Sequence, residues 1–108
     1  MKIDIQSPGL EPNQELEIFV YKEVGKLFHL YKEVFSSEVY LNLDSSSAKE
    51  NKRCRIRLVV RGSDLFATAK GNMFEEAIAQ SAEALKRQIE KSRIKKRKRI
   101  SDTTLPDA

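Results

Sequence analysis

The sequence predicts one α+β domain with the element order β-α-β-β-β-α, in which a four-stranded sheet has two helices packed on one face. Three observations predict this class. Four stretches alternate apolar and polar residues as half-buried strands do, two longer stretches repeat apolar residues at helical spacing, and 108 residues suffice for one modest core. Since each predicted strand has a single apolar face, we expect the other face of the sheet to be open to water.

The first two predicted elements are a short strand and an amphipathic helix. Residues 2–6 alternate and place Ile3 and Ile5 on the core face. The helix is expected from about Asn13, a favourable N-cap residue, to Tyr31. Its apolar stripe consists of Leu16, Val20, Val24, Leu27 and Tyr31.

Three further strands are predicted after the first helix. The second strand covers residues 38–44 and the fourth covers 65–70, with a polar loop expected at residues 45–51. The inward residues of the second strand are expected to be Val39, Leu41 and Leu43. In the third strand, apolar residues alternate with a set that we call the arginine row: Arg53, Arg55, Arg57 and Arg61.

The last predicted element is a long helix from Met73 to Arg99. Asn72 is its expected N-cap, and Glu75 at the third position would complete a capping box. The first half has apolar residues at helical spacing up to Ile89, and the second half loses this stripe. We therefore predict one domain over residues 1–99, followed by a disordered tail at residues 100–108.

The second half of this helix concentrates the positive charge of the chain. Residues 86–99 hold nine Lys or Arg and one Glu, a net charge of +8, whereas the whole chain carries only +4. A 27-residue helix is about 40 Å long, and a seven-residue strand spans about 23 Å. The basic half is therefore predicted to overhang the sheet. An overhanging basic helix favours an anionic partner, of which nucleic acid is the leading candidate.

Composition narrows the functional classes. A single cysteine forms no internal disulfide, the first residues do not resemble a signal peptide, and no apolar run has membrane length. The sequence contains no phosphate-binding loop, dinucleotide turn, metal-ligand spacing or nucleophile elbow. We expect a cytoplasmic protein with no cofactor, no metal, no small-molecule substrate, no membrane partner and no enzymatic activity. His29 is interpreted as a surface residue and Cys54 as a small buried hydrophobe.

Several charged and aromatic residues have two interpretations. The basic helix end is either a solvated tail or a phosphate-binding surface, and Lys22 and Lys26 of the first helix are open to the same alternatives. The arginine row is either a second RNA surface or a solvated face whose charges pair with Glu38 and Asp44. Aromatic residues that could stack on bases are Tyr21, Tyr40 and Phe66.

Two stretches of the sequence carry motifs of a known family. Residues 67–78 read Ala-Thr-Ala-Lys-Gly-Asn-Met-Phe-Glu-Glu-Ala-Ile, similar to Ala-x-Ala-x-Gly followed by Asp-Met-Tyr-x-Ala-Ile-Asp, and residues 85–89 read Leu-Lys-Arg-Gln-Ile before a basic end, similar to Leu-x-Arg-Gln-Leu. With these motifs the chain resembles the family of ribosome hibernation promoting factors and ribosome-associated inhibitors, also called the sigma-54 modulation family. The resemblance covers nearly all of residues 1–99.

The resemblance implies a translation inhibitor that binds the small ribosomal subunit and its rRNA under stress or in stationary phase. It would lie in the channel between head and body and block access of mRNA and tRNA. The chain resembles a short form without the second, dimerising domain, and we expect it to be monomeric when free. The implied rRNA-binding residues are Lys22, Lys26, Lys86, Arg87, Lys91, Arg93, Lys95, Lys96, Arg97, Lys98 and Arg99.

The chain also departs from the family pattern. Asn72 and Ala79 stand where the family usually has Asp, Ala84 where a basic residue is common, and Glu23 where the first helix often has Lys. We therefore expect some rRNA contacts to be missing, or to lie further along the basic end. The alternatives to ribosome inhibition are a general RNA-binding or ribosome-assembly module, and an adaptor that binds an acidic protein.

Overall fold

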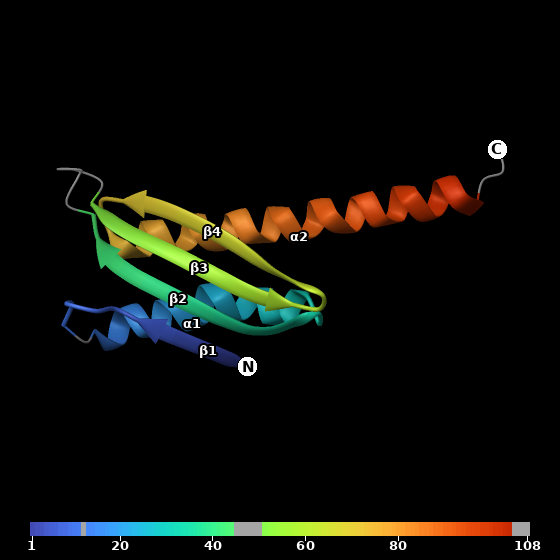
Figure 1. Cartoon of the computed structure of the whole chain (residues 1–108). Helices are drawn as coiled ribbons and strands as arrows, with labels where there is room; N and C mark the ends of the chain where they lie inside the picture. The colour runs from blue at the N-terminus through green and yellow to red at the C-terminus, as the bar shows by residue number, and fades with distance from the viewer. Residues whose placement is uncertain (12, 45–50, 105–108) are drawn as a thin grey trace.

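The computed structural model describes residues 1–11, 13–44 and 51–104, with side chains described as far as Ser92. Its element order confirms the predicted β-α-β-β-β-α arrangement (Figure 1). The elements are β1 (Lys2–Gln6), α1 (Gln14–Leu30), β2 (Val34–Leu43), β3 (Lys52–Val60), β4 (Ser63–Gly71) and α2 (Phe74–Thr104).

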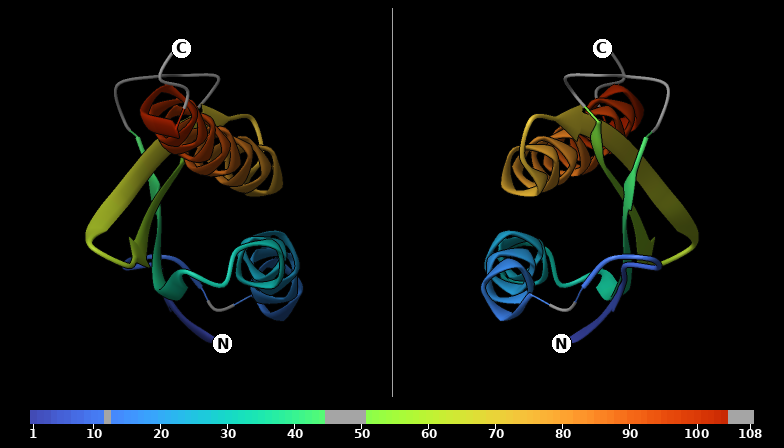
Figure 2. Two further views of the ribbon diagram at one scale, coloured as in Figure 1. Left: turned by 90° about the vertical axis from the view of Figure 1, so that its right-hand side faces the viewer. Right: turned by 90° about the vertical axis from the view of Figure 1, so that its left-hand side faces the viewer.

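The four strands form one mixed sheet in the order β1-β2-β3-β4. β1 is parallel to β2 because α1 carries the chain back across the sheet between them, whereas β2, β3 and β4 are antiparallel neighbours. Both helices cover the same face of this sheet, as the end-on views of Figure 2 show. The predicted layer arrangement is therefore confirmed.

The core lies between the sheet and the two helices. α1 contributes the buried residues Val20, Val24 and Leu27, and the strands and α2 contribute further buried residues. These are Val39, Leu41, Cys54, Ile56, Leu58, Ala77, Ile78, Ala82 and Leu85. Two buried serines are satisfied by backbone carbonyls, since Ser37 Oγ donates to Arg57 O at 3.1 Å and Ser81 Oγ donates to Cys54 O at 3.2 Å.

The start of α1 follows the sequence prediction. The side chain of Asn13 caps the helix, because its Oδ1 accepts a hydrogen bond from Leu16 N at 3.1 Å. Within the helix, an added Cβ at Gly25 would lie 3.3 Å from Met1 Sδ. The absence of a side chain at Gly25 therefore lets the first residue of the chain pack closely across α1.

The bounds and facing of β2 differ from the prediction. β2 begins at Val34 rather than Glu38, because Val34 pairs with Val60 and Arg61 N donates to Glu33 O at 3.0 Å. Leu43 was expected to face inward but is 51% exposed, since it is the last residue of β2 and lies beyond the buried rows. Of the predicted loop, residues 45–50 lie outside the described residues.

The capping prediction for α2 is corrected by one residue. The helix begins at Phe74, so Met73 rather than the predicted Asn72 stands at the N-cap position, and the third position after it is Glu76 rather than Glu75. Glu76 Oε1 accepts a hydrogen bond from Asn72 N at 3.3 Å. A Cβ added at Gly71 would lie 2.6 Å from the same oxygen, so this close return of Glu76 depends on glycine at the end of β4.

α2 overhangs the body as predicted. Its last buried residue among those described is Ile89, yet the helix continues to Thr104 and projects far beyond the end of the sheet (Figure 1). A helix of 31 residues is about 46 Å long, and the longest dimension of the molecule is 58 Å.

The end of α2 differs from the predicted end at Arg99. The helix includes residues 100–104 of the predicted tail, because no Gly or Pro occurs between Phe74 and Pro106. Residues 105–108 lie outside the described residues. Among the described helices, none combines the length and the apolar character needed to cross a membrane.

Candidate nucleic-acid interface

The candidate interface consists of the solvent side of the helix layer and the overhang of α2, defined as residues 90–104. α1 and α2 lie side by side on the sheet and run in the same direction (Figures 1 and 2). This arrangement places the predicted binding residues of α1 and of the first half of α2 in one layer. Lys22, Lys26 and Arg87 are exposed there, Lys86 is partly buried, and Lys91 is exposed at the start of the overhang.

Two of these cations have carboxylate neighbours. Lys26 Nζ lies 3.2 Å from Glu23 Oε2, and Arg87 Nε lies 3.8 Å from Glu83 Oε2. Both cationic side chains remain mostly exposed, and exposed ion pairs of this kind are weak. Lys26 and Arg87 therefore remain available to exchange these carboxylates for a phosphate group.

The remaining predicted residues lie on the overhang. These residues are Arg93, Lys95, Lys96, Arg97, Lys98 and Arg99. The helical backbone continues through all six positions. Their side chains lie outside the described part of the structure. Helical spacing places Arg87, Lys91, Lys95 and Lys98 along one flank, so a ribbon of positive charge is expected from the body to the overhang.

The base of the overhang is held from two sides. Tyr31 Oη, at the end of α1, donates a hydrogen bond to Glu90 Oε2 at 2.9 Å. Gln88 Nε2 donates to the backbone oxygen of Phe66 in β4 at 2.9 Å. These contacts fix where α2 leaves the body, and the sequence reasoning did not find them. One feature of the sequence could have indicated the contact with Tyr31, since Glu90 is the single acidic residue in the basic stretch of residues 86–99.

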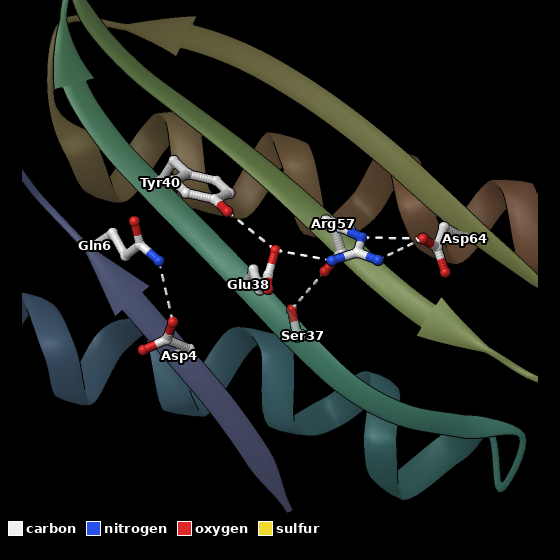
Figure 3. Close-up of polar contacts among 7 residues, drawn as sticks. All are labelled: Asp4, Gln6, Ser37, Glu38, Tyr40, Arg57 and Asp64. Carbon is white, nitrogen blue, oxygen red and sulfur yellow. Dashed lines mark hydrogen bonds and ion pairs between the residues drawn. The ribbon is translucent and has the colours of Figure 1, made fainter.

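Of the arginine row, Arg53, Arg55 and Arg57 lie on the outer face of the sheet, opposite the helices, whereas Arg61 lies in the turn after β3. Arg57 pairs there with Glu38, as the interpretation of the row as a charge-paired face expects. Arg57 Nη1 lies 3.1 Å from Glu38 Oε1, and Arg57 Nη2 lies 2.7 Å from Asp64 Oδ2 (Figure 3). The pairing with Asp64 was missed because the fourth strand was expected to begin at Leu65, whereas β4 begins at Ser63 and includes Asp64. Asp44, the other predicted partner, contacts Lys70 Nζ instead.

Hydrogen bonds within this cluster shift its titration. The pKa of Glu38 is lowered, first by the hydrogen bond from Arg57 and then by that from the hydroxyl of Tyr40. The pKa of Arg57 is raised, chiefly by its hydrogen bond to Asp64. These shifts mean that both charged forms are favoured in the folded protein, so Arg57 is held by carboxylates rather than presented to an anion.

The single histidine and the single cysteine of the chain lie in different surroundings, His29 beside Lys22 and Lys26 on α1 and Cys54 in the core. Cys54 is buried, and desolvation raises the pKa of its thiol to about 12. His29 is exposed on α1, as interpreted from the sequence. Within the part of the chain that the structure describes, no three His, Cys, Asp or Glu side chains gather into a group that could hold a metal ion.

Solved structures with the same fold are found at low sequence identity. A ribosomal subunit interface protein from Coxiella burnetii matches with a TM-score of 0.76 and 15% identity, covering 87% of this chain and 99% of that one. The N-terminal domain of Protein Y from Thermus thermophilus matches with a TM-score of 0.71 and 19% identity, covering 84% of this chain and 98% of that one. At these identities the similarity establishes the fold.

The sequence itself establishes the family. No curated protein matches the chain significantly. The family described as sigma 54 modulation protein / S30EA ribosomal protein, in contrast, matches residues 3–97, which is most of the chain. The chain therefore belongs to the sigma 54 modulation protein / S30EA ribosomal protein family, a family of ribosome-associated proteins.

Proposed function

We propose that this protein binds rRNA of the small ribosomal subunit and blocks the channel that mRNA and tRNA occupy, and so inhibits translation under stress or in stationary phase. The observation that carries the proposal is the overhang, in which a helix of 31 residues has its last described core contact at Ile89 and continues as a highly basic rod. Membership of a family of ribosome-associated proteins supports the ribosome as the anionic partner of this rod.

In this proposal the overhang and the helix layer bind the sugar-phosphate backbone. Lysine and arginine side chains on the flank of a helix can neutralise phosphates on both sides of a narrow RNA channel, and such contacts position a protein without reading sequence. A helix with its side chains is about 10–12 Å thick, so the overhang fits a channel wider than this. The compact sheet behind it would then fill space that mRNA and tRNA require, so binding and inhibition would be the same event.

The salt dependence of binding follows from this mechanism. Each phosphate that the protein neutralises releases condensed counterions, which adds about −0.7 to −0.9 to the slope of log affinity against log salt concentration. If half of the eleven candidate cations make contact, a rise from about 50 to 200 mM salt should weaken binding by roughly two orders of magnitude or more. A monomer that acts by occlusion should also bind small subunits and whole ribosomes with a stoichiometry of one.

Sedimentation of a stationary-phase lysate at low and high salt tests this proposal. The protein should travel with small subunits and ribosomes at low salt and leave them at high salt. A second arm compares purified small subunits with a free RNA duplex. Equal affinity for both would contradict the proposal and favour a general RNA-binding module, and protein found only in the free fraction at every salt concentration would exclude ribosome association.

A further inference from the structure

The outer face of the sheet carries a groove that the helix layer and the overhang do not share. The groove has a volume of about 510 Å³ and crosses β2, β3 and β4. Its lining includes Tyr40, Asn42, Arg53, Arg55 and Phe66. Because both helices lie on the opposite face, a ligand here would not touch the surface proposed for ribosome binding (Figure 2).

The charges around this groove are divided into a neutralised part and an unpaired part. Arg57 is held between Glu38 and Asp64 at one end of the groove (Figure 3). Arg53 and Arg55 lie nearer the start of β3 than Arg57 does, and they form no ion pair with any residue that the structure describes. The part of the groove around Arg53 and Arg55 is therefore complementary to an anion, whereas the part around Arg57 is not.

The aromatic ring of Phe66 lies beside Arg55 on the neighbouring strand. Phe66 is 46% exposed in the middle of β4, where the strand register places it directly opposite Arg57. The guanidinium carbon of Arg55 lies 5.3 Å from the centroid of the Phe66 ring. The ring of Tyr40 lines the same groove, and the strand register places Tyr40 directly opposite Arg55.

We propose that this groove binds a single-stranded RNA segment, with one base stacked on Phe66 and the adjoining phosphates on Arg53 and Arg55. An exposed ring beside the Arg55 guanidinium, with Arg53 two residues away on the same strand, matches the two features that repeat along a single strand, a flat base and a charged phosphate. A duplex would not use the ring, because its bases are already stacked on one another. An acidic peptide would use the arginines but leave the ring exposed.

The test uses the full chain with the overhang neutralised, so that the basic helix does not mask binding to the groove. In this background Arg93, Lys95, Lys96, Arg97, Lys98 and Arg99 are replaced by Gln. Fluorescence anisotropy then measures the affinity for a labelled single strand of about ten nucleotides and for a hairpin of the same length. The single strand should bind more tightly than the hairpin.

Two substitutions locate the binding. Phe66→Ala should weaken single-strand binding by about 5- to 150-fold, the range expected for the loss of one stacked base. Phe35→Ala is the matched control, because Phe35 is an exposed phenylalanine of β2 that does not line the groove, and it should leave the affinity unchanged. Replacing Arg53 and Arg55 by Gln should reduce the salt slope by about 1 to 2.

Chemical shift mapping on the same protein keeps the outcome decisive if a variant folds poorly. Titration with the single strand should shift amide signals of Arg53, Arg55, Phe66 and their strand neighbours. Unchanged affinity in Phe66→Ala, or shifts confined to α1 and α2, would overturn the proposal. The proposed ribosome binding is measured separately by sedimentation, so either proposal can fail while the other holds.

Discussion

The hydroxyl of Tyr31 donates a 2.9 Å hydrogen bond to the carboxylate of Glu90 and so joins the end of α1 to α2 where α2 leaves the body. Glu90 directly follows Ile89, the last described residue of α2 that is buried. On the other side of α2, Gln88 holds the backbone of Phe66. The direction of the overhang is therefore set by contacts on two flanks, and it does not depend on the stiffness of the helix alone.

Tyr31→Phe should lower the free energy of unfolding by about 1–2 kcal/mol, because it removes one hydrogen bond to a charged group and keeps the buried ring. Urea unfolding followed by circular dichroism measures the change. Tyr21→Phe is the matched control, since the Tyr21 hydroxyl makes only a 3.4 Å hydrogen bond to Ile3 O and Tyr21 is 43% exposed. Equal losses in the two variants would argue against a specific role for the contact with Glu90.

Gly71→Ala should destabilise the protein by about 1–2 kcal/mol, because the new methyl group would lie 2.6 Å from Glu76 Oε1 and 3.1 Å from Glu76 Cβ. A double-mutant cycle with Glu76→Ala separates the causes. Removing the carboxylate should make the second Gly71→Ala substitution less costly than it is in the parent. Strict additivity would show that the clash with Glu76 is not the reason for glycine at this position.

The Glu38 cluster should contribute to acid sensitivity. Hydrogen bonds in the folded state lower the pKa of the Glu38 carboxyl below its ordinary value of 4.5. The ionised carboxylate therefore stabilises the fold above pH 4.5, and this stabilisation is lost as the pH falls through the lower pKa of the folded state. Melting temperatures of the parent should therefore fall between about pH 5 and pH 2. Glu38→Gln should show a smaller fall over the same range, whereas parallel curves would mean that the pair with Arg57 adds nothing to this dependence.

Cys54 should be chemically silent in the native protein. Its thiol is buried and its pKa is raised to about 12 by desolvation, so almost no thiolate exists at pH 8. Reaction with a thiol reagent should therefore be slow in buffer and rapid in denaturant, at a rate limited by unfolding. A rapid stoichiometric reaction without denaturant would contradict the packing of β3 against α2.

The sequence predicted the layers of this fold well because each strand buries one face. Alternation at Cys54, Ile56 and Leu58 and the helical stripe of α1 report burial directly, and all of these residues except the flanking Leu16 are buried in the structure. Leu43 was also expected to face the core, but it is exposed because it is the last residue of β2. Alternation predicts which side of a strand a residue occupies, but it does not predict how far along the strand the helices reach.

The candidate site was only partly predictable for a related reason. The charge of residues 86–99 and the helical period were visible in the sequence, so the overhang could be expected before its position was known. Side-chain partners depend on strand register and on turns. One of the two interpretations of the arginine row included Glu38 as a partner, and this holds for Arg57. The pair with Asp64 and the contact between Asp44 and Lys70 required the three-dimensional arrangement.

If the overhang itself carries the proposed ribosome binding, variants that remove the same charge inside and outside the overhang should differ in binding. One variant combines Lys95→Gln, Lys96→Gln and Lys98→Gln. It should weaken cosedimentation with small subunits by at least tenfold at about 100 mM salt, because three phosphate contacts are lost. Its thermal stability should be nearly unchanged. The control combines Lys2→Gln, Lys32→Gln and Arg61→Gln, which remove the same charge outside the overhang, and should bind almost as the parent does. Equal losses in both variants, or a stable overhang variant that still binds like the parent, would mean that the overhang does not carry ribosome binding.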